Sequence, residues 1–371
     1  MKIGKTKKKI IYIAEFSLPN MSAYAVHVLK MCDNLCKHGY DVELVLPFVN
    51  NNYFFNKIKK DYLLKNKYKI KSIFKSKFRL NFLLRILFSI RIFFHLKKMS
   101  LNIILSRSII PSLILALLNF KNILEIHTEV TGLTYYFFKL NKLKKIKKNI
   151  KFVVLNSKLI NLLDVKESNT IVLGDSVELK DFLNKKNKIN KFTCAYSGSF
   201  VPGKGLEIIY QLAKKMPKIN FDLYGNVKTL DKNFNFNTKP KNLNFKGFVS
   251  YKKITKILQT YKILLMPYQK KVDVLIKGVD VSNYFSPLKL FEYMAAGKVI
   301  VASKLKVYSK ILKHKRNAIL LKPHNINEWI KAINKIFGSS KFDYLGRNAK
   351  KDVRKYSWEE RAKKIIQFSE S

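Results

Sequence analysis

Residues 284–298 read YFSPLKLFEYMAAGK, and this stretch says most about the architecture of the chain. Ser286 suits the N-cap of a helix and Pro287 its first position, so the stretch predicts a helix that begins here. The N–H groups of Leu288 and Lys289 would then lack intrahelical partners, and helix starts of this kind bind anions.

Lys289 and Glu292 are three residues apart, which makes them neighbours on one face of the predicted helix. A lysine that meets phosphate and a carboxylate that accepts two ribose hydroxyls would suit a nucleoside diphosphate. A surface salt bridge is the alternative and the commoner meaning of this spacing. The core-like neighbours Phe291, Met294 and Ala295 favour the first interpretation.

Upstream, residues 196–207 read YSGSFVPGKGLE, which predicts the end of a strand, a loop and the start of a helix. Gly203 and Gly205 let backbone amides approach a ligand closely, and Lys204 adds a positive charge, as a phosphate requires. An ordinary turn with a solvated lysine stays open as the alternative for this loop taken alone.

Around these motifs, short apolar runs alternate with amphipathic stretches. The alternation predicts an α/β fold with mostly parallel sheets that are covered on both faces. We expect two Rossmann-like, doubly wound domains, with a ligand cleft at the carboxyl ends of their strands. The expected strands are 10–14, 41–47, 101–105, 122–126, 151–155, 192–196, 220–224, 244–248, 262–267 and 298–302.

The composition excludes several classes of protein. Hydrophobic residues make up 47% of the 371, which is enough for two cores and excludes disorder. Lys and Arg total 73 against 24 Asp and Glu, and only eight of the 73 are Arg. The net charge of +49 attracts anionic lipid and nucleic acid, but specific base readout favours Arg, so no specific nucleic-acid partner is expected.

No signal peptide or membrane span is predicted, because the longest apolar-rich segment, 109–120, contains Pro111 and is too short to cross a bilayer. The odd number of cysteines, three, indicates a reducing compartment. We therefore expect a cytoplasmic protein, with Cys32 and Cys36 as small buried thiols rather than metal ligands.

The motifs resemble those of retaining glycosyltransferases of family 4, which have the GT-B fold. The segment 286–298 resembles the donor-site motif of their SPxKxxEYMA subgroup, and 196–205 resembles the first motif of their second domain. This resemblance implies an acceptor-binding domain over 1–185 and a domain for the nucleotide sugar over 190–355. The final helix, 356–371, is expected to pack back on the first domain.

The resemblance also implies roles for single residues. Lys204 would stabilise the donor diphosphate, Glu292 would hold its ribose, and His127 falls where the family has a histidine beside the transferred sugar. These three are the expected catalytic residues. The other expected site residues are Ser199, Gly203, Gly205, Tyr284, Ser286, Pro287, Leu288 and Lys289 for the donor, and Ser22 and Arg107 for the acceptor and the cleft.

Several positions depart from the family pattern. Many members carry an Arg where this chain has Ser199, which puts more weight on Lys204. Many carry a second Glu eight positions before Glu292, where this chain has Tyr284, although the subgroup tends to lack it too. The loop 17–23, which the family makes glycine-rich, contains no glycine, so acceptor or sugar recognition there is expected to be unusual.

Residues 78–98 predict an amphipathic helix, and the basic run 142–151 lies in the same half of the chain. A broad apolar face flanked by bases is typical of a helix that lies on an anionic membrane. A helix packed on the sheet of the first domain is an equally open alternative. The polar side of the predicted helix comprises Asn81, Arg85, Ser89, Arg91 and His95.

These features predict a glycosyltransferase that moves a hexose-type sugar from a nucleotide diphosphate sugar to a lipid-linked or oligosaccharide acceptor with retention, in bacterial surface polysaccharide biosynthesis. No cofactor or metal is expected, because cations and amides can stabilise the leaving diphosphate. The expected location is the anionic inner face of the cytoplasmic membrane. The alternatives are a GT-B nucleotide-sugar epimerase and a basic nucleic-acid-binding protein.

Overall fold

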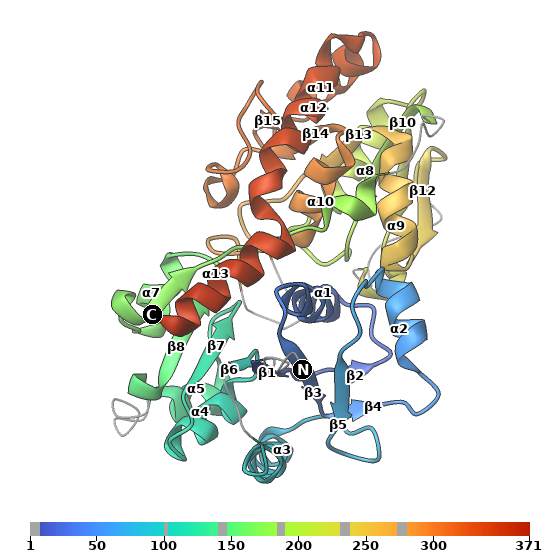
Figure 1. Ribbon diagram of the computed structural model, residues 1–371. Coiled ribbons are helices and arrows are strands. Elements are labelled where there is room, and N and C mark those ends of the chain that lie inside the picture. Colours follow the sequence, from blue (N-terminus) through green and yellow to red (C-terminus); the bar gives the residue numbers. More distant parts are fainter. Residues whose placement is uncertain (1–7, 100–102, 140–146, 184–189, 231–237, 273–279) are drawn as a thin grey trace, which may run out of the picture. The chain divides into compact units, whose positions relative to one another are not determined.

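The computed structural model describes residues 8–99, 103–139, 147–183, 190–230, 238–272 and 280–371. The chain divides into two compact units, the first formed by residues 1–174 and 358–371 and the second by residues 175–357. Each unit is built on its own parallel sheet with helices between successive strands (Figure 1). The expected α/β fold with two parallel sheets is therefore confirmed.

In the first unit, seven described strands form a sheet in the order β5-β3-β1-β6-β7-β8-β9. Its strands are β1 Lys9–Ile13, β3 Asp41–Leu46, β5 Lys69–Ser72, β6 Ile103–Ser106, β7 Asn122–Ile126, β8 Ile150–Val154 and β9 Thr170–Val172, and β2 Ser17–Leu18 pairs separately with β4 Phe48–Val49. Its helices are α1 Ala23–Lys37, α2 Phe55–Tyr62, α3 Phe82–Leu96, α4 Ile109–Leu117, α5 Gly132–Lys139, α7 Lys158–Leu163 and α13 Trp358–Glu370.

The strand order of this unit reverses direction between β1 and β6, which are neighbours in the sheet. At such a reversal the crossover helices leave on opposite faces, and a crevice opens outside the carboxyl ends of the strands. The segments that follow β1, β6 and β7 therefore meet at one edge of the sheet.

In the second unit, six described strands form a sheet in the order β12-β11-β10-β13-β14-β15. Helices α8 and α11 pack together on this sheet around the buried Trp329, because each presents an apolar stripe at helical spacing. The strands are β10 Asn190–Ser197, β11 Asn220–Tyr224, β12 Leu243–Gly247, β13 Tyr261–Met266, β14 Val299–Ser303 and β15 Ile319–Leu321. The helices are α8 Leu206–Lys215, α9 Tyr251–Ile257, α10 Leu288–Ala296, α11 Ile326–Phe337 and α12 Asp343–Asp352.

The boundary between the units lies earlier in the chain than the expected linker around residues 182–190. Val177 forms a parallel bridge with Ser357, and the N–H of Asp175 donates to the Ser286 hydroxyl at 2.9 Å. These bonds join residues 175–183 to the second unit, whereas they were expected in the first. Residues 184–189 of the expected linker lie outside the described residues.

The predicted amphipathic helix is α3, which begins after the N-cap Asn81. One face of α3 packs into the core of the first unit through Phe88, Ile92 and Leu96, so the packed alternative is correct for that face. The basic run 142–151 lies mostly outside the described residues. Among the described helices, none has the length and apolar content that crossing a membrane requires.

Candidate functional site

The loop between β10 and α8 has the strand–loop–helix form that its glycines predict. Gly203 and Gly205 adopt φ values of +81° and +91°, which are open to glycine at little cost. A Cβ atom would lie 2.1 Å from the Lys271 carbonyl oxygen at Gly203 and 2.0 Å from the Pro267 carbonyl oxygen at Gly205. Only glycine therefore lets this loop lie directly against the segment that follows β13.

Lys204 lies between these glycines and points back across the loop. Its ammonium group donates to the Ser199 hydroxyl at 2.7 Å, so the residue that replaces the family's Arg is bonded to the expected catalytic lysine. Burial lowers the pKa of Lys204 to about 8, because desolvation disfavours the charged form. Lys204 is therefore half-buried and bonded within the loop, unlike the solvated lysine of the alternative.

Helix α10 begins one residue later than expected. Its N-cap is Pro287, and the Ser286 hydroxyl makes no capping bond but accepts the N–H of Asp175 at 2.9 Å. Leu288 and Lys289 thus form the first turn of the helix, where N–H groups have no intrahelical carbonyl to bind. Ser286 acts as a tie between two segments of the second unit rather than as a cap.

Lys289 is buried, with 8% of its surface exposed, and its side-chain nitrogen lies 3.7 Å from the centre of the Tyr196 ring. That nitrogen has no hydrogen-bond partner among the described residues. Burial and the charge of Lys204 lower the pKa of Lys289 well below its usual range, although Glu292 opposes this. A buried ammonium group without a hydrogen-bond partner is costly, so Lys289 is a candidate for binding an anion.

Gly198 joins the two motifs. A Cβ atom at this position would lie 2.5 Å from the Lys289 nitrogen, so the glycine makes room for the lysine side chain. The strand β10 that ends at Ser197 and the helix start of α10 therefore meet at one place. Because Lys289 is buried, the alternative of a salt bridge at the surface is wrong.

Glu292 lies half-buried on α10, on the same side as Lys289. Burial raises the pKa of Glu292 to about 7, with Lys289 lowering it and Asp175 raising it. Tyr284 is buried before α10, at the position where many family members have a second Glu. All the expected donor residues, including Tyr284, thus lie in the second unit.

In the first unit, the carboxyl ends of β6 and β7 bring Arg107 and His127 into one neighbourhood. Burial and the nearby Arg107 charge lower the pKa of His127 to about 3, although the hydrogen bond that the ring donates to Glu125 raises it, so the imidazole stays neutral. The Arg107 guanidinium lies 4.2 Å from the centre of the Tyr24 ring, and its NH1 atom is buried without a hydrogen-bond partner in the described residues.

Ser22 lies at the start of α1 and is exposed, and its hydroxyl accepts the Ala25 N–H at 3.2 Å as a helix cap. Ser22, the expected acceptor residue, therefore caps helix α1 at the end of the glycine-free loop. His127, Arg107 and Ser22 belong to the first unit, whereas all the expected donor residues belong to the second.

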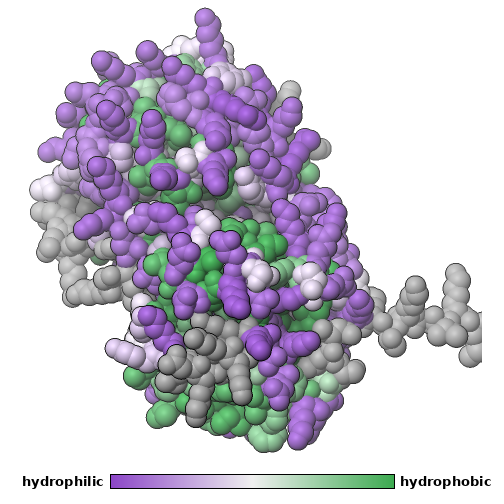
Figure 2. All heavy atoms as spheres, turned by 90° about the vertical axis from the view of Figure 1, so that its left-hand side faces the viewer, coloured by the Kyte–Doolittle hydropathy of each residue, from purple (hydrophilic) through white to green (hydrophobic). Residues whose placement is uncertain are grey.

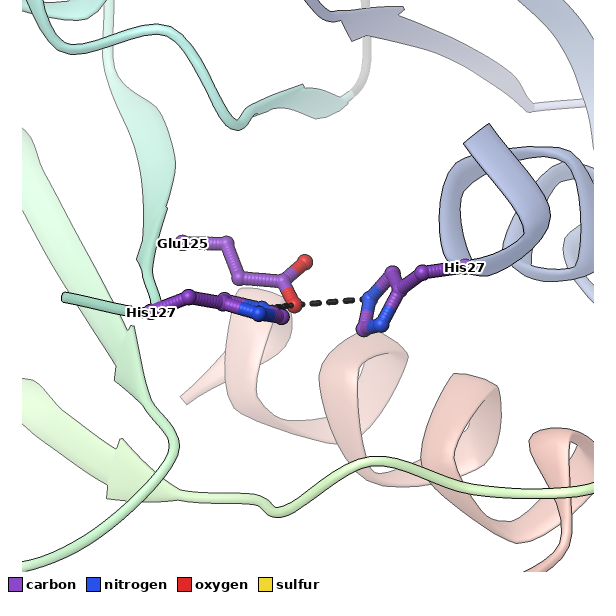
Figure 3. Close-up of side chains that lie close together, drawn as sticks. All are labelled: His27, Glu125 and His127. Atoms are coloured by element: carbon purple, nitrogen blue, oxygen red, sulfur yellow. Dashed lines mark hydrogen bonds and ion pairs between the residues drawn. The ribbon is translucent and has the colours of Figure 1, made fainter. Parts of the chain in front are cut away.

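The structure adds Glu125 and His27 to this neighbourhood, and neither residue was predicted from the sequence. Figure 3 shows the Glu125 carboxylate between the rings of His27, on α1, and His127, at the end of β7. A charged residue between the apolar Leu124 and Ile126 of the buried strand NILEI was the available signal. One potential ligand atom from each of the three lies within 4.8 Å of the others.

Glu125 is ionised in this environment. Burial would raise its pKa, but the charges of His27 and Arg361 and the hydrogen bond from His127 outweigh burial and hold the pKa well below its usual range. The carboxylate is buried, so these groups stabilise it with little screening by water. Because Arg361 donates to the same oxygen at 2.6 Å, this cluster fits a proton-bearing network better than a metal ion.

Comparisons with known proteins show which family this chain resembles. Residues 179–352 match the family of glycosyl transferases group 1. Over 124 residues, the chain is 30% identical to the uncharacterized glycosyltransferase MJ1607 of Methanocaldococcus jannaschii, which is 33% of this chain and 28% of that relative. The chain thus spans less than a third of the curated relative that it matches.

The similarity to solved structures extends over nearly the whole chain. A glycosyltransferase from Rickettsia africae superposes with a TM-score of 0.73 at 12% identity, over 99% of this chain and 98% of that one. Anabaena Alr3699/HepE in complex with UDP superposes with a TM-score of 0.69 at 12% identity, over 97% and 98%. At such identities the likeness shows the fold, which is that of GT-B glycosyltransferases.

Proposed function

We propose that this chain, whose residues 179–352 match the glycosyl transferases of group 1, is a retaining hexosyltransferase of that family. The donor is a nucleotide diphosphate sugar, and the acceptor is a lipid-linked or oligosaccharide glycan of bacterial surface polysaccharide biosynthesis. In this proposal the second unit, residues 175–357, binds the donor, and the first unit, residues 1–174 with 358–371, binds the acceptor.

The observation that carries the proposal is the buried Lys289 nitrogen, which has no hydrogen-bond partner in the described structure and lies close enough to Lys204 to lower its own pKa. Two neighbouring buried lysines repel each other, and a diphosphate between them removes that cost. Lys289 thereby supplies the second cation that the family's missing Arg, here Ser199, would otherwise provide.

The roles of the donor residues follow from the charge that the reaction develops. The bond between the anomeric carbon and the diphosphate oxygen breaks, and the electron pair leaves with the diphosphate. Lys204, Lys289 and the first N–H groups of α10 stabilise that negative charge. The acceptor hydroxyl bonds to the same face of the sugar and passes its proton to the departing phosphate oxygen. Glu292 holds the ribose, and His127 and Arg107 face the transferred sugar.

Helix α3 supports a membrane-bound acceptor, because it exposes large apolar side chains that a helix in water would normally bury. Its buried face pairs Arg85 with Glu15 at 2.9 Å and His95 with Glu43 at 2.8 Å. Its outer face is an exposed apolar stripe at helical spacing, which we call the α3 stripe. The α3 stripe comprises Leu83, Leu87, Ile90 and Phe94, which are 73%, 40%, 42% and 59% exposed.

Exposed bases flank the α3 stripe at both ends of the helix. Figure 2 shows hydrophobic side chains at the surface near the foot of the first unit, at the height of α3, α4 and α5 in Figure 1. An apolar stripe between cationic ends suits insertion into the headgroup region of an anionic bilayer. The flanking bases are Lys75, Lys77, Arg79, Lys97 and Lys98.

The test of the donor site is thermal stabilisation by a panel of nucleoside diphosphates and their sugars, in salt high enough to suppress nonspecific anion binding. A ligand at a hundred times its dissociation constant adds about 2.7 kcal/mol of stability. We expect one nucleotide to stabilise the wild type and Lys228→Met, an exposed-lysine control, but not Lys204→Met. Equal shifts with every polyanion would contradict the proposal.

The test of the reaction uses that nucleotide's sugar with membrane lipid extract as the acceptor source. Radiolabel transferred to lipid supports the hexosyltransferase. An altered free nucleotide sugar, formed without any acceptor, would instead identify an epimerase.

A further inference from the structure

Glu125 lies within strand β7 and is buried, yet polar side chains from β1, α1 and α13 converge on it, together with the neighbouring His127. Its Oε1 atom lies 2.6 Å from Nε2 of His127 and 2.8 Å from Nε2 of His27 (Figure 3). The guanidinium of Arg361, on the last helix α13, donates to the same oxygen at 2.6 Å, and the Tyr12 hydroxyl donates to Oε2 at 3.0 Å.

The chemistry of this cluster decides the tautomer of His127. An ionised carboxylate only accepts hydrogen bonds, so the Nε2 atom of His127 that faces Glu125 must carry the proton. The neutral ring then has its lone pair on Nδ1. A histidine fixed in this way can accept a hydrogen bond from a sugar hydroxyl through Nδ1 but cannot donate one there.

Arg361 is the group that holds Glu125 in place. Besides its bond to the carboxylate, its NH1 atom donates to the backbone carbonyl oxygens of Leu173 and Gly174 at 2.8 and 2.9 Å. The guanidinium is buried, so its charge acts on Glu125 with little screening by water. A residue near the end of the chain thereby orients a side chain of β7.

A metal ion at this cluster is the competing explanation, since His27, Glu125 and His127 could each offer one ligand atom. The Oε1 atom toward which both imidazoles point is already bound by the Arg361 cation. A second cation at that oxygen would face the guanidinium at close range in a buried environment, where repulsion is strong. The geometry therefore favours the hydrogen-bonded network.

We propose that Glu125 and Arg361 are positioning residues, which fix the His127 imidazole in its Nε2–H tautomer with Nδ1 free to accept from a sugar hydroxyl. The catalytic meaning of this arrangement rests on the proposed function, whereas the tautomer itself does not. The last helix thus contributes to the site in addition to completing the fold of the first unit.

The first experiment is a long-range nitrogen–proton correlation spectrum of protein labelled with ¹⁵N in its histidine rings, with His127→Gln to assign the signal. We expect Nε2–H and an unprotonated Nδ1 for His127 in the wild type. In Glu125→Gln and Arg361→Met, the other tautomer becomes populated. A wild-type His127 that carries its proton on Nδ1 overturns the proposal without any variant.

The matched control is Lys37→Met. Lys37 pairs with Glu359, so this change also weakens the contact between α13 and α1 but leaves Glu125 untouched. We expect the His127 signal of Lys37→Met to match the wild type. If Lys37→Met and Arg361→Met shift the tautomer equally, the effect is one of helix packing and the positioning role is wrong.

The second experiment is a kinetic cycle on sugar transfer. Arg361→Met should lower kcat about tenfold or more with little change in the donor KM, the size that misplacement of a catalytic group produces. In a His127→Ala background the same change should cost almost nothing, since Arg361 acts through His127. If Arg361→Met lowers kcat by the same factor with and without His127→Ala, Arg361 does not act through His127 and the proposal is wrong. If no acceptor gives transfer, the proposed function fails while the ring spectra still decide the tautomer.

Discussion

At the scale of single residues, two lysines and one glutamate of the second unit have pKa values that burial moves toward neutrality. Burial lowers the pKa of Lys204 to about 8 and raises that of Glu292 to about 7. Such shifted pKa values destabilise the protein without ligand and are typical of groups that bind a charged ligand. Single substitutions of these residues therefore test the proposed donor site most directly.

We predict that Lys289→Met abolishes stabilisation by the nucleotide but leaves the melting temperature unchanged or higher. The methionine fills a similar volume against the Tyr196 ring and removes a buried nitrogen that has no hydrogen-bond partner in the described structure. Thermal melts with and without nucleotide measure both effects. Retained nucleotide stabilisation in this variant would remove Lys289 from the site.

We predict a bell-shaped dependence of kcat/KM on pH. Glu292 must be ionised to accept ribose hydroxyls, so the rate should rise as pH rises through about 7. Lys204 must be charged to meet the diphosphate, so the rate should fall as pH rises through about 8. Lys204→Arg should move the falling limb beyond pH 9, because a guanidinium stays protonated there. If the falling side of the profile stays near pH 8 in Lys204→Arg, a group other than Lys204 is responsible for it.

At the scale of elements, the local sequence pattern predicts the loop before α8 and helix α3. Tertiary contacts determine what the loop packs against and which face of α3 is buried. The sequence predicts that the loop glycines let backbone amides approach a ligand, whereas in the structure both glycines lie against carbonyls of the protein itself, those of Pro267 and Lys271. For α3 the helix was predicted, but which face is buried depends on the partners that Glu15 and Glu43 offer to Arg85 and His95.

We predict that Gly205→Ala destabilises the protein more than Gly247→Ala does. Both glycines have positive φ, at +91° and +72°, and a left-handed alanine costs roughly 1–2 kcal/mol. A Cβ at Gly247 meets nothing within 4 Å, whereas at Gly205 it meets a backbone carbonyl at 2.0 Å, which adds about 1–3 kcal/mol. Urea unfolding compares the two; equal losses would mean that the loop relaxes freely.

We predict that Leu83→Ser combined with Phe94→Ser reduces binding to vesicles of anionic lipid, with no loss of thermal stability. Both side chains are exposed, so the change removes apolar surface that only a bilayer would cover. The control is Leu162→Ser, a leucine on α7 that is 50% exposed. Equal vesicle binding by the control and the α3 variant would show that the α3 stripe is not the contact.

At the scale of the whole molecule, the net charge of +49 sets the response to salt. Attraction of the whole surface to polyanions is screened at high ionic strength, whereas a buried donor site is screened much less. We predict that added salt releases the protein from nucleic acid and weakens vesicle binding, while the selective nucleotide stabilisation persists. Sedimentation and thermal melts across a salt series measure this. A nucleotide effect that decays in step with nucleic-acid binding would indicate one nonspecific cationic surface.

The alternation of strands and helices could be predicted from the sequence, because buried strands and amphipathic helices each have a characteristic spacing of hydrophobic residues. The sequence missed α2, β5 and β9, which are short and have few buried residues, so their pattern is weak. It also misjudged the role of Ser286, because its partner, the Asp175 N–H, is 111 residues away in the chain.

The sequence by itself determined the fold and the two glycine-dependent motifs, and it pointed to the lysines and glutamate of the candidate donor site, since these depend on local spacing and residue type. Only the tertiary structure decided which charges are buried together. The Lys289 nitrogen lies over Tyr196 with Gly198 making room for it, and Arg361 reaches Glu125 across 236 positions of the chain. Such pairs leave no periodic signal, because they form only when the sheet brings distant segments to one edge.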